Sequence, residues 1–536
     1  NADSLTVYTK HTKLASAGIY SVSSGTSNIT ADNINITAVN DGSTANSKAF
    51  AINQDAAGGT LNIGTAESSL IHLESNKGEY TASGNDSSKN YAVNAVIGKV
   101  NIQGKTIELV SSGVTSRAVV ATTGGTVTIG NQNSNTMLSS NGSKDGHAVY
   151  GTGQDSAVNV YGQTINIASF GGETSKAVLS DEGSQVSILG KTIELVSSGD
   201  TSRTVEATNG GTVDIGNQNS YTMLSSNGSS RSLAVYGTGQ DSTVNVYGQT
   251  INIASDGAIA NAVLSYDGSQ VNIGQSDSAV TISSKGTGEI VGLRAVKGVV
   301  TLNADTLAVT TENTSENGYS VGLMARNDSE QSERPEDGAA INITANQTDI
   351  TSDGVGISAY SNSQVNMDTG LTLTAPTAIE TRGNSLVNIN PNNDKTVVIN
   401  GDVSFATAAV GSGQILNAEV NINLSGAQSS WTGNIKLDYP TQGGAQTEIT
   451  DGVTLTLSNQ AQWTPTKVVE TGDSGQTVET QALRLLKLND GIVNISRELG
   501  TLEVAELQGS GGVINAEAAK DEAGNLESST VKIGRA

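Results

Sequence analysis

The sequence predicts an all-β fold, a right-handed three-stranded parallel β-helix (solenoid) of about 16–18 coils. Three observations support this fold: short segments recur every ~27–30 residues, apolar and polar residues alternate within them, and Gly, Asn and Asp separate them. A short unit with one apolar face per strand cannot bury that face alone, so successive units must stack to make a core. The right hand follows from the general preference of parallel crossover connections.

The clearest repeat is 86 residues long. Residues 148–169 read AVYGTGQDSAVNVYGQTINIAS, and residues 234–255 repeat 21 of these 22 letters, with Thr243 in place of Ala157. Each long copy contains three of the short units, which indicates that three coils were duplicated together. We therefore expect one repeat array, with a β-helix body and loop insertions over residues 1–400 and terminal coils over residues 401–536.

Each unit is predicted to contain three strands. The first is an Ala-Val segment such as residues 118–121, the second a Val-x-Ile triplet such as residues 127–129, and the third TIELVSS or TINIAS, as at Thr106 and Thr164. Alternation implies that Val127 faces inward and that its polar neighbour faces outward. No segment has the spacing or the caps of a helix.

Composition excludes several classes of function. The 536 residues include 28 Lys and Arg against 52 Asp and Glu, a formal net charge of −24, so the mean field repels polyanions and we expect no nucleic-acid partner. The absence of Cys excludes disulfides and thiolate metal sites. No apolar run reaches the ~18 residues of a membrane span. We expect no metal and no cofactor.

One edge of the predicted solenoid nevertheless carries basic residues. Alignment of the coils places a Lys, Arg or His before the first strand in several units, with Arg231 one residue out of step. The third residue of that strand, Glu206 in one coil, is expected to face outward beside them. Cations pair with sulfate or carboxylate groups, and Tyr rings pack on sugars, whereas the alternative is a solvated turn edge. The predicted glycan-binding residues are Lys48, Arg117, His147, Tyr150, Lys176, Arg203, Arg231 and Tyr236.

The middle strands place a second row of polar residues on another face. One interpretation is a soluble face held by hydrogen-bonded Asn side chains, and the other is a flat surface for a partner protein or a second copy of the chain. The predicted protein-binding residues are Asn101, Asn159, Asp214, Asn245 and Asn272.

Catalytic signals are weak. Residues 472–475 read GDSG, as around the nucleophile of chymotrypsin-like proteases, but such a serine needs a histidine base, and His11, His72 and His147 lack the neighbours typical of those enzymes. The carboxylates form no tight cluster of the kind that calcium-dependent β-helix lyases use. We predict no catalytic residue, with a polysaccharide-degrading enzyme as an alternative.

The repeat pattern AVxAxxGGxVxIxGxTIxIxSxG resembles the passenger domains of type V autotransporters of the diffuse-adherence and self-associating adhesin group. Residues 500–518, with Trp431 and Trp463 upstream, are similar to the terminal coils that help such passengers fold outside the outer membrane. The resemblance implies a bacterial surface or secreted virulence adhesin, anchored through a membrane barrel that this sequence lacks. It implies host glycosaminoglycan and a matrix protein such as fibronectin as ligands, with self-association, aggregation and biofilm formation as the alternative.

Overall fold

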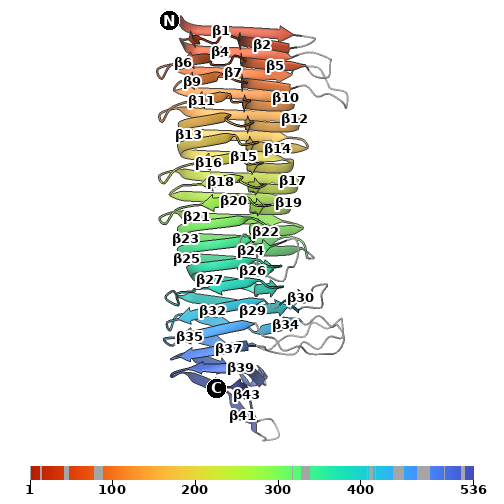
Figure 1. Cartoon of the computed structure of the whole chain (residues 1–536), viewed down its shortest axis with the longest axis vertical. Coiled ribbons are helices and arrows are strands. Elements are labelled where there is room, and N and C mark those ends of the chain that lie inside the picture. Colours follow the sequence, from red (N-terminus) through yellow and green to blue (C-terminus); the bar gives the residue numbers. More distant parts are fainter. Residues whose placement is uncertain are drawn as a thin grey trace. The chain divides into compact units, whose positions relative to one another are not determined.

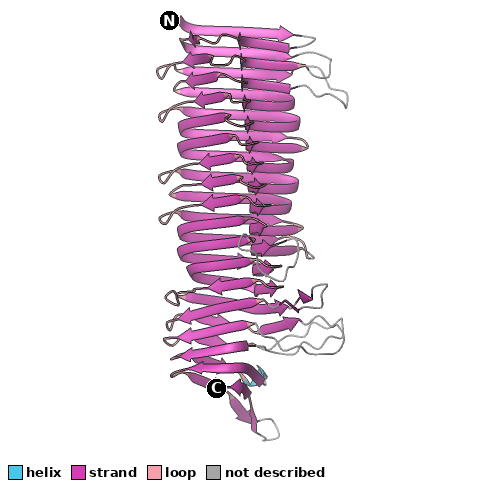
Figure 2. Ribbon diagram, in the orientation of Figure 1, coloured by secondary structure: helices cyan, strands magenta, loops and turns pink. Residues whose placement is uncertain are grey.

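The computed structural model describes residues 2–11, 15–40, 47–77, 89–316, 318–327, 338–406, 408–409, 415–416, 418–438, 452–466, 483–499, 501–520 and 526–536. Over these residues the protein is an all-β parallel solenoid of about 16 turns, as predicted (Figure 1, Figure 2). The one helical segment in these ranges is a 3-10 turn, η1 (Arg497–Leu499), and no described helix is long and apolar enough to cross a bilayer. The GDSG tetrapeptide lies outside the described residues.

The chain divides into two compact units, Asn1–Glu289 and Ile290–Ala536. The boundary at residue 400 that the sequence suggests stays a prediction. The strands of unit 1 are β1 (Ala2–His11), β2 (Ala15–Ser21), β3 (Thr26–Ile29), β4 (Ala31–Asn40), β5 (Lys48–Gln54), β6 (Thr60–Gly64), β7 (Leu70–Lys77), β8 (Lys89–Ala95), β9 (Lys99–Gln103), β10 (Thr106–Thr122), β11 (Thr126–Ile129), β12 (Asn135–Thr152), β13 (Ala157–Gly171), β14 (Thr174–Asp181), β15 (Gln185–Thr208), β16 (Thr212–Ile215), β17 (Tyr221–Thr238), β18 (Thr243–Val246), β19 (Thr250–Tyr266), β20 (Gln270–Ile273) and β21 (Ala279–Gly286).

From the boundary onward the strands are β22 (Glu289–Val296), β23 (Val299–Asn313), β24 (Tyr319–Arg326), β25 (Ala340–Ser352), β26 (Val355–Tyr360), β27 (Gln364–Arg382), β28 (Leu386–Ile389), β29 (Val397–Ala406), β30 (Ala408–Ala409), β31 (Ile415–Leu416), β32 (Glu419–Ser425), β33 (Ser430–Thr432), β34 (Ile435–Asp438), β35 (Val453–Ser458), β36 (Gln462–Thr464), β37 (Leu483–Asn489), β38 (Ile492–Ile495), β39 (Thr501–Gly509), β40 (Val513–Ala516), β41 (Ala518–Lys520), β42 (Leu526–Ser528) and β43 (Thr530–Arg535). Two short described pairs are antiparallel, β30 with β31 and β41 with β42.

The core of unit 1 is built from aliphatic ladders. Val127 of β11 lies opposite Val100 of β9 and Val158 of β13, and all three side chains are fully buried. Each such side chain contributes roughly 1.5–3 kcal/mol of hydrophobic stabilisation. The structure differs from the predicted three separate strands in one respect. The third strand of one turn often continues through the corner into the first strand of the next turn. β10, for example, contains both the TIELVSS segment and the first strand of the next turn.

The tight turns follow the expected residue chemistry. Between β15 and β16, Asn209 has φ 50° and Gly210 has φ 79°, both in the left-handed region. Gly adopts this region without steric cost, and Asn tolerates it better than most residues. These turns fix the angle at which each middle strand begins.

In unit 2, two buried tryptophans from successive turns stack on each other. Trp431 of β33 and Trp463 of β36 lie in register, with ring centroids 5.2 Å apart and planes inclined by 15°. The indole N–H groups donate to the carbonyl oxygens of Gly401 and Gly433 at 2.9 and 3.1 Å. Stacking, burial and satisfied donors together stabilise these turns.

Candidate functional site

Serine side chains fill the inside of the corner that precedes the first strand in several turns of unit 1. Ser116 Oγ donates to the Ser111 carbonyl at 2.6 Å, and Ser140 Oγ donates to the Ser116 carbonyl at 2.8 Å. All three serines are fully buried. Small side chains that satisfy their own hydroxyl groups let the backbone segments of the bend pack closely. The residue that follows this bend lies at the outer edge of the corner.

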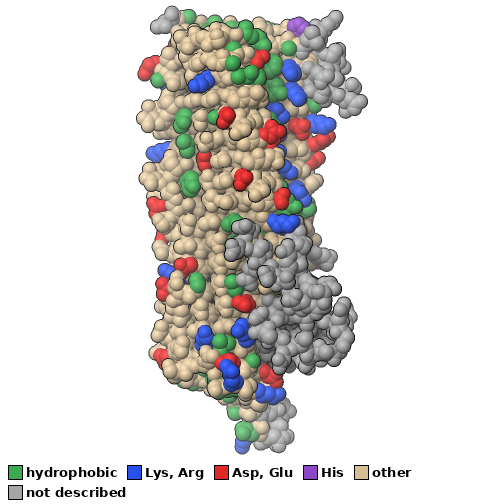
Figure 3. Space-filling view, viewed as in Figure 1, with side chains coloured by type: hydrophobic (Ala, Val, Ile, Leu, Met, Phe, Trp, Pro, Cys, Tyr) green, Lys and Arg blue, Asp and Glu red, His purple; other side chains and the backbone are tan. Residues whose placement is uncertain are grey.

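The structure brings four of the predicted residues into one row at this edge. Arg117 of β10 pairs with His147 of β12, His147 with Lys176 of β14, and Lys176 with Arg203 of β15. We call these four residues the basic row. Consecutive members are one turn apart, about 4.8 Å. On the face in Figure 3, Lys and Arg side chains gather along the right-hand edge of unit 1, with Asp and Glu among them.

Lys48 and Arg231 do not belong to this row. Lys48 pairs with Lys89, and Arg231 pairs with Thr201, so both lie two residues before the row position. The row position is instead taken by Phe50 and Tyr91 before Arg117 and by Leu233 after Arg203. Tyr91 precedes Ala92-Val93 just as Arg117 precedes Ala118-Val119, so stricter alignment on the Ala-Val pair would have found it.

Arginine guanidinium groups lie over the rings of the tyrosines at this site. The Arg117 guanidinium lies 4.3 Å from the ring centroid of Tyr150 and 5.9 Å from that of Tyr91, and Arg203 lies 5.1 Å from that of Tyr236. Such contacts attract the cation to the ring face. Each guanidinium covers one face of the ring that it contacts, and the packing of a sugar on Tyr150 or Tyr236 stays a prediction.

Glu206 is the acidic member of the cluster, and its side chain is buried. We expected it to be exposed, but its side chain is only 4% exposed because Lys176 and Arg203 cover the carboxylate. Arg203 Nη1 donates to Oε1 at 2.8 Å, and Lys176 Nζ lies 2.9 Å from Oε2 without hydrogen-bond alignment. The three cations and this carboxylate leave a formal charge of +2 at the corner.

His147 does not act as a fourth cation. Its side chain is buried, and burial followed by the positive charges of Arg117, Lys176 and Arg203 lowers its pKa well below the usual value. The imidazole is therefore neutral at pH 7. Its Nδ1 atom is buried without a hydrogen-bond partner, as are the Nε atoms of Arg117 and Arg203.

The second predicted row forms a ladder of hydrogen-bonded side chains. Asn272 Nδ2 donates to Asn245 Oδ1, and Asn245 Nδ2 donates to Asp214 Oδ1, both at 2.8 Å. Asn101 donates in the same way to Asn62, whereas Asn159 lies between Thr128 and Ser187. A primary amide has two N–H donors, so each Asn keeps hydrogen-bonding capacity for water or a partner.

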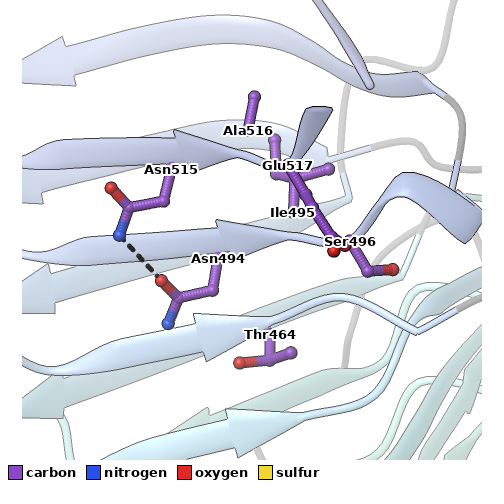
Figure 4. Close-up of a pocket in the computed structure, with 7 residues that line it drawn as sticks. All are labelled: Thr464, Asn494, Ile495, Ser496, Asn515, Ala516 and Glu517. Carbon is purple, nitrogen blue, oxygen red and sulfur yellow. Dashed lines mark hydrogen bonds between the residues drawn. The ribbon is translucent and has the colours of Figure 1, made fainter. Parts of the chain in front are cut away.

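A shallow pocket in unit 2 offers different chemistry (Figure 4). Asn515 donates to Asn494 at 2.9 Å on one side, and Glu517 accepts a hydrogen bond from the Arg497 backbone at 3.0 Å on the other. The pocket contains a carboxylate and no basic side chain, which disfavours an anionic ligand. It is lined by Thr464, Asn494, Ile495, Ser496, Asn515, Ala516 and Glu517.

Unit 2 also contains a cluster of titratable groups. Tyr319 Oη donates to Glu380 Oε2 at 3.2 Å, and burial together with this carboxylate raises the pKa of Tyr319 to about 12. Burial likewise raises the pKa of Tyr360, which also donates to Glu380. Both phenols are thus protonated hydrogen-bond donors. Over the described residues, no group of three or more His, Asp or Glu side chains is arranged to hold a metal ion.

Comparisons with known proteins identify no relative. No family model, no curated protein and no solved structure matches the chain.

Proposed function

We propose that this chain is the passenger of a surface-displayed bacterial adhesin and that the basic row binds an anionic host glycan. The observation that carries the proposal is the stacking of Arg117, Lys176 and Arg203 on one corner of a protein with a formal net charge of −24. Cations repeated along one line suit a linear polyanion, because each additional contact becomes intramolecular once the first has formed. A glycosaminoglycan has this charge pattern.

The parallel β-solenoid and the resemblance of the repeats to autotransporter passengers support the adhesin class and a cell-surface or secreted location. A host matrix protein, fibronectin by resemblance, is proposed to dock on the Asn and Asp row. Self-association that drives cell aggregation and biofilm formation is the alternative use of that row. Sedimentation at high protein concentration distinguishes the two, because only self-association produces dimers without a ligand.

The glycan proposal is tested by retention on immobilised heparin across a salt gradient. The triple variant Arg117→Gln, Lys176→Gln and Arg203→Gln should lose retention, whereas the wild type should elute at a salt concentration that screens the site. A charge-matched control neutralises three exposed lysines outside the row, Lys99, Lys105 and Lys191. Circular dichroism checks that each variant is folded.

The comparison between the two triple variants decides the outcome. Retention that is lost only in the basic-row variant supports the site. Equal retention of both variants shows that the row is solvated turn charge and overturns the proposal.

A further inference from the structure

We infer that anion binding at the basic row is coupled to protonation of His147, so the corner binds a sulfated glycan more tightly as pH falls. This inference rests on the proposed glycan function and adds a regulatory residue to the same site. It makes His147 a ligand-contacting group rather than a spacer between two cations.

The position of His147 carries the argument. It lies in the row with Arg117 one turn before it and Lys176 one turn after it. Its side chain is only 8% exposed, its ring meets Tyr150 edge-on at a centroid distance of 5.6 Å, and its Nδ1 has no partner. The unpaired Nδ1 is an N–H donor whenever the ring is protonated, and an anionic oxygen that bound there would then accept its hydrogen bond.

The charges around the ring explain why it is neutral without a ligand. Protonation would add a positive charge beside existing ones, in a position where burial already disfavours the charged form. The carboxylate of Glu206 is engaged by Lys176 and Arg203 and is not among the groups that shift the pKa of His147. The charged and titratable groups around His147 are Arg117 from β10, Tyr150 from β12, Lys176 from β14, and Arg203 and Glu206 from β15.

A sulfate group placed across Arg117 and Lys176 changes this balance. Its negative charge offsets the two cations, and its oxygens accept a hydrogen bond from the imidazole, so the bound state favours the proton. Binding and protonation are linked reciprocally, since a ligand that favours the protonated ring is in turn favoured by it. Below the pKa of the free protein each unit of rise gives about tenfold tighter binding, and at pH 5.5 a gain of about tenfold requires the bound sulfate to return the His147 pKa to about its ordinary value of 6.5.

The chain itself supplies the control substitution. Leu233 occupies the row position one turn after Arg203, at the site that matches His147 in the second 86-residue copy, and it is 2% exposed. His147→Leu therefore places a side chain that this corner already accommodates. It removes the titrating group and keeps Arg117, Lys176 and Arg203.

The experiment measures the dissociation constant for immobilised heparin at pH 7.5 and pH 5.5, at constant ionic strength, for the full chain and for His147→Leu. The wild type should gain about three- to tenfold more affinity on acidification than the variant. Partial protonation of other carboxylates affects both proteins equally. An identical pH response in both proteins overturns the coupling while leaving the glycan site intact, and no wild-type binding at either pH overturns both proposals.

Histidine resonances give a direct second readout. The His147 signal, assigned by its absence in His147→Leu, should titrate at a higher pH when soluble heparin is added. A titration midpoint that heparin leaves unchanged contradicts the inference even if the affinities differ.

Discussion

The buried carboxylate of Glu206 should stabilise the corner while weakening the site for anions. Glu206→Gln removes the charge and keeps the shape of the side chain. The chain contains a precedent for a corner without this acid, because Val120 holds the matching position in the first 86-residue copy and is only 3% exposed. Stability and glycan affinity are therefore expected to change in opposite directions.

The size of the stability effect follows from the two contacts. Hydrogen bonds to charged groups contribute about 1.5–3 kcal/mol, and breaking a fully buried pair costs about 3–5 kcal/mol because a charge is left uncompensated. The side chains of Lys176 and Arg203 are 13% and 24% exposed, so water partly compensates them after the substitution. We expect Glu206→Gln to lower the free energy of unfolding by about 1–3 kcal/mol.

The affinity effect follows from the charge count. The formal charge of the corner rises from +2 to +3 when Glu206 is neutralised, and Lys176 and Arg203 become available to the ligand. Urea unfolding followed by circular dichroism measures the first effect, and the salt concentration of elution from heparin measures the second. Glu194→Gln is the control, because it removes the same charge from a half-buried position outside the row.

Two results would refute this reasoning. An unfolding midpoint equal to that of the wild type would mean that the ion pairs of Glu206 contribute no net stability. An elution shift equal to that of Glu194→Gln would mean that heparin responds to the total charge of the protein and not to the corner.

Two further predictions concern other parts of the chain. Trp463→Phe removes the hydrogen bond to Gly433 and part of the stack on Trp431, the only other tryptophan, and should destabilise unit 2 by about 1–3 kcal/mol; fluorescence-detected urea unfolding tests this, and an unshifted midpoint contradicts it. Because the pKa of His147 is lowered in the folded state, the unfolded chain binds an extra proton in acid, and stability falls as pH drops below about 6.5. His147→Leu should lose less stability than the wild type between pH 7.5 and pH 5, and equal losses would contradict the assignment.

The repeated fold was predictable because its determinants are local. The alternation of apolar and polar residues around Val127 lies within a single unit, as do the turn residues Asn209 and Gly210. Each unit repeats the same pattern of strands and turns. The alignment of Arg117, Lys176 and Arg203 was accessible for the same reason, since each follows the same bend and precedes the same kind of strand.

Lys48 and Arg231 were assigned to the row because each is the basic residue closest to it, although one register irregularity also lies in the bend before Arg231. Two residues of β17 lie between Gly228 and Arg231, whereas one residue of β19 lies between their partners Gly257 and Ile259. This extra residue lies before Arg231, and Arg231 stays two residues before the row position, which Leu233 takes directly before Ala234. Sequence alignment that starts from the cation rather than from the buried strand cannot detect such a shift.

Contacts between turns were the second source of error. Glu206 is covered by Arg203 of its own turn and by Lys176 of the preceding one, and the pKa of His147 depends on cations from three other strand segments. Alternation within a single strand predicts which side chains leave the core. It does not predict whether long side chains of a neighbouring turn then cover them.

The 86-residue duplication explains why the site is found where it is. Both copies keep the Arg of the row and its contact with a Tyr of the next turn, at 4.3 Å for Arg117 and 5.1 Å for Arg203. The copies differ at the outward positions that complete the cluster. Leu233 and Asn261 of the second copy match His147 and Lys176 of the first. Glu206 of the second copy matches Val120 of the first. Duplication thus supplied a stable scaffold and a repeated Arg–Tyr contact, while divergence at a few outward positions created a single charged corner. A binding function for that corner requires no change to the aliphatic interior, because the ladders of Val and Ile are the same in both copies.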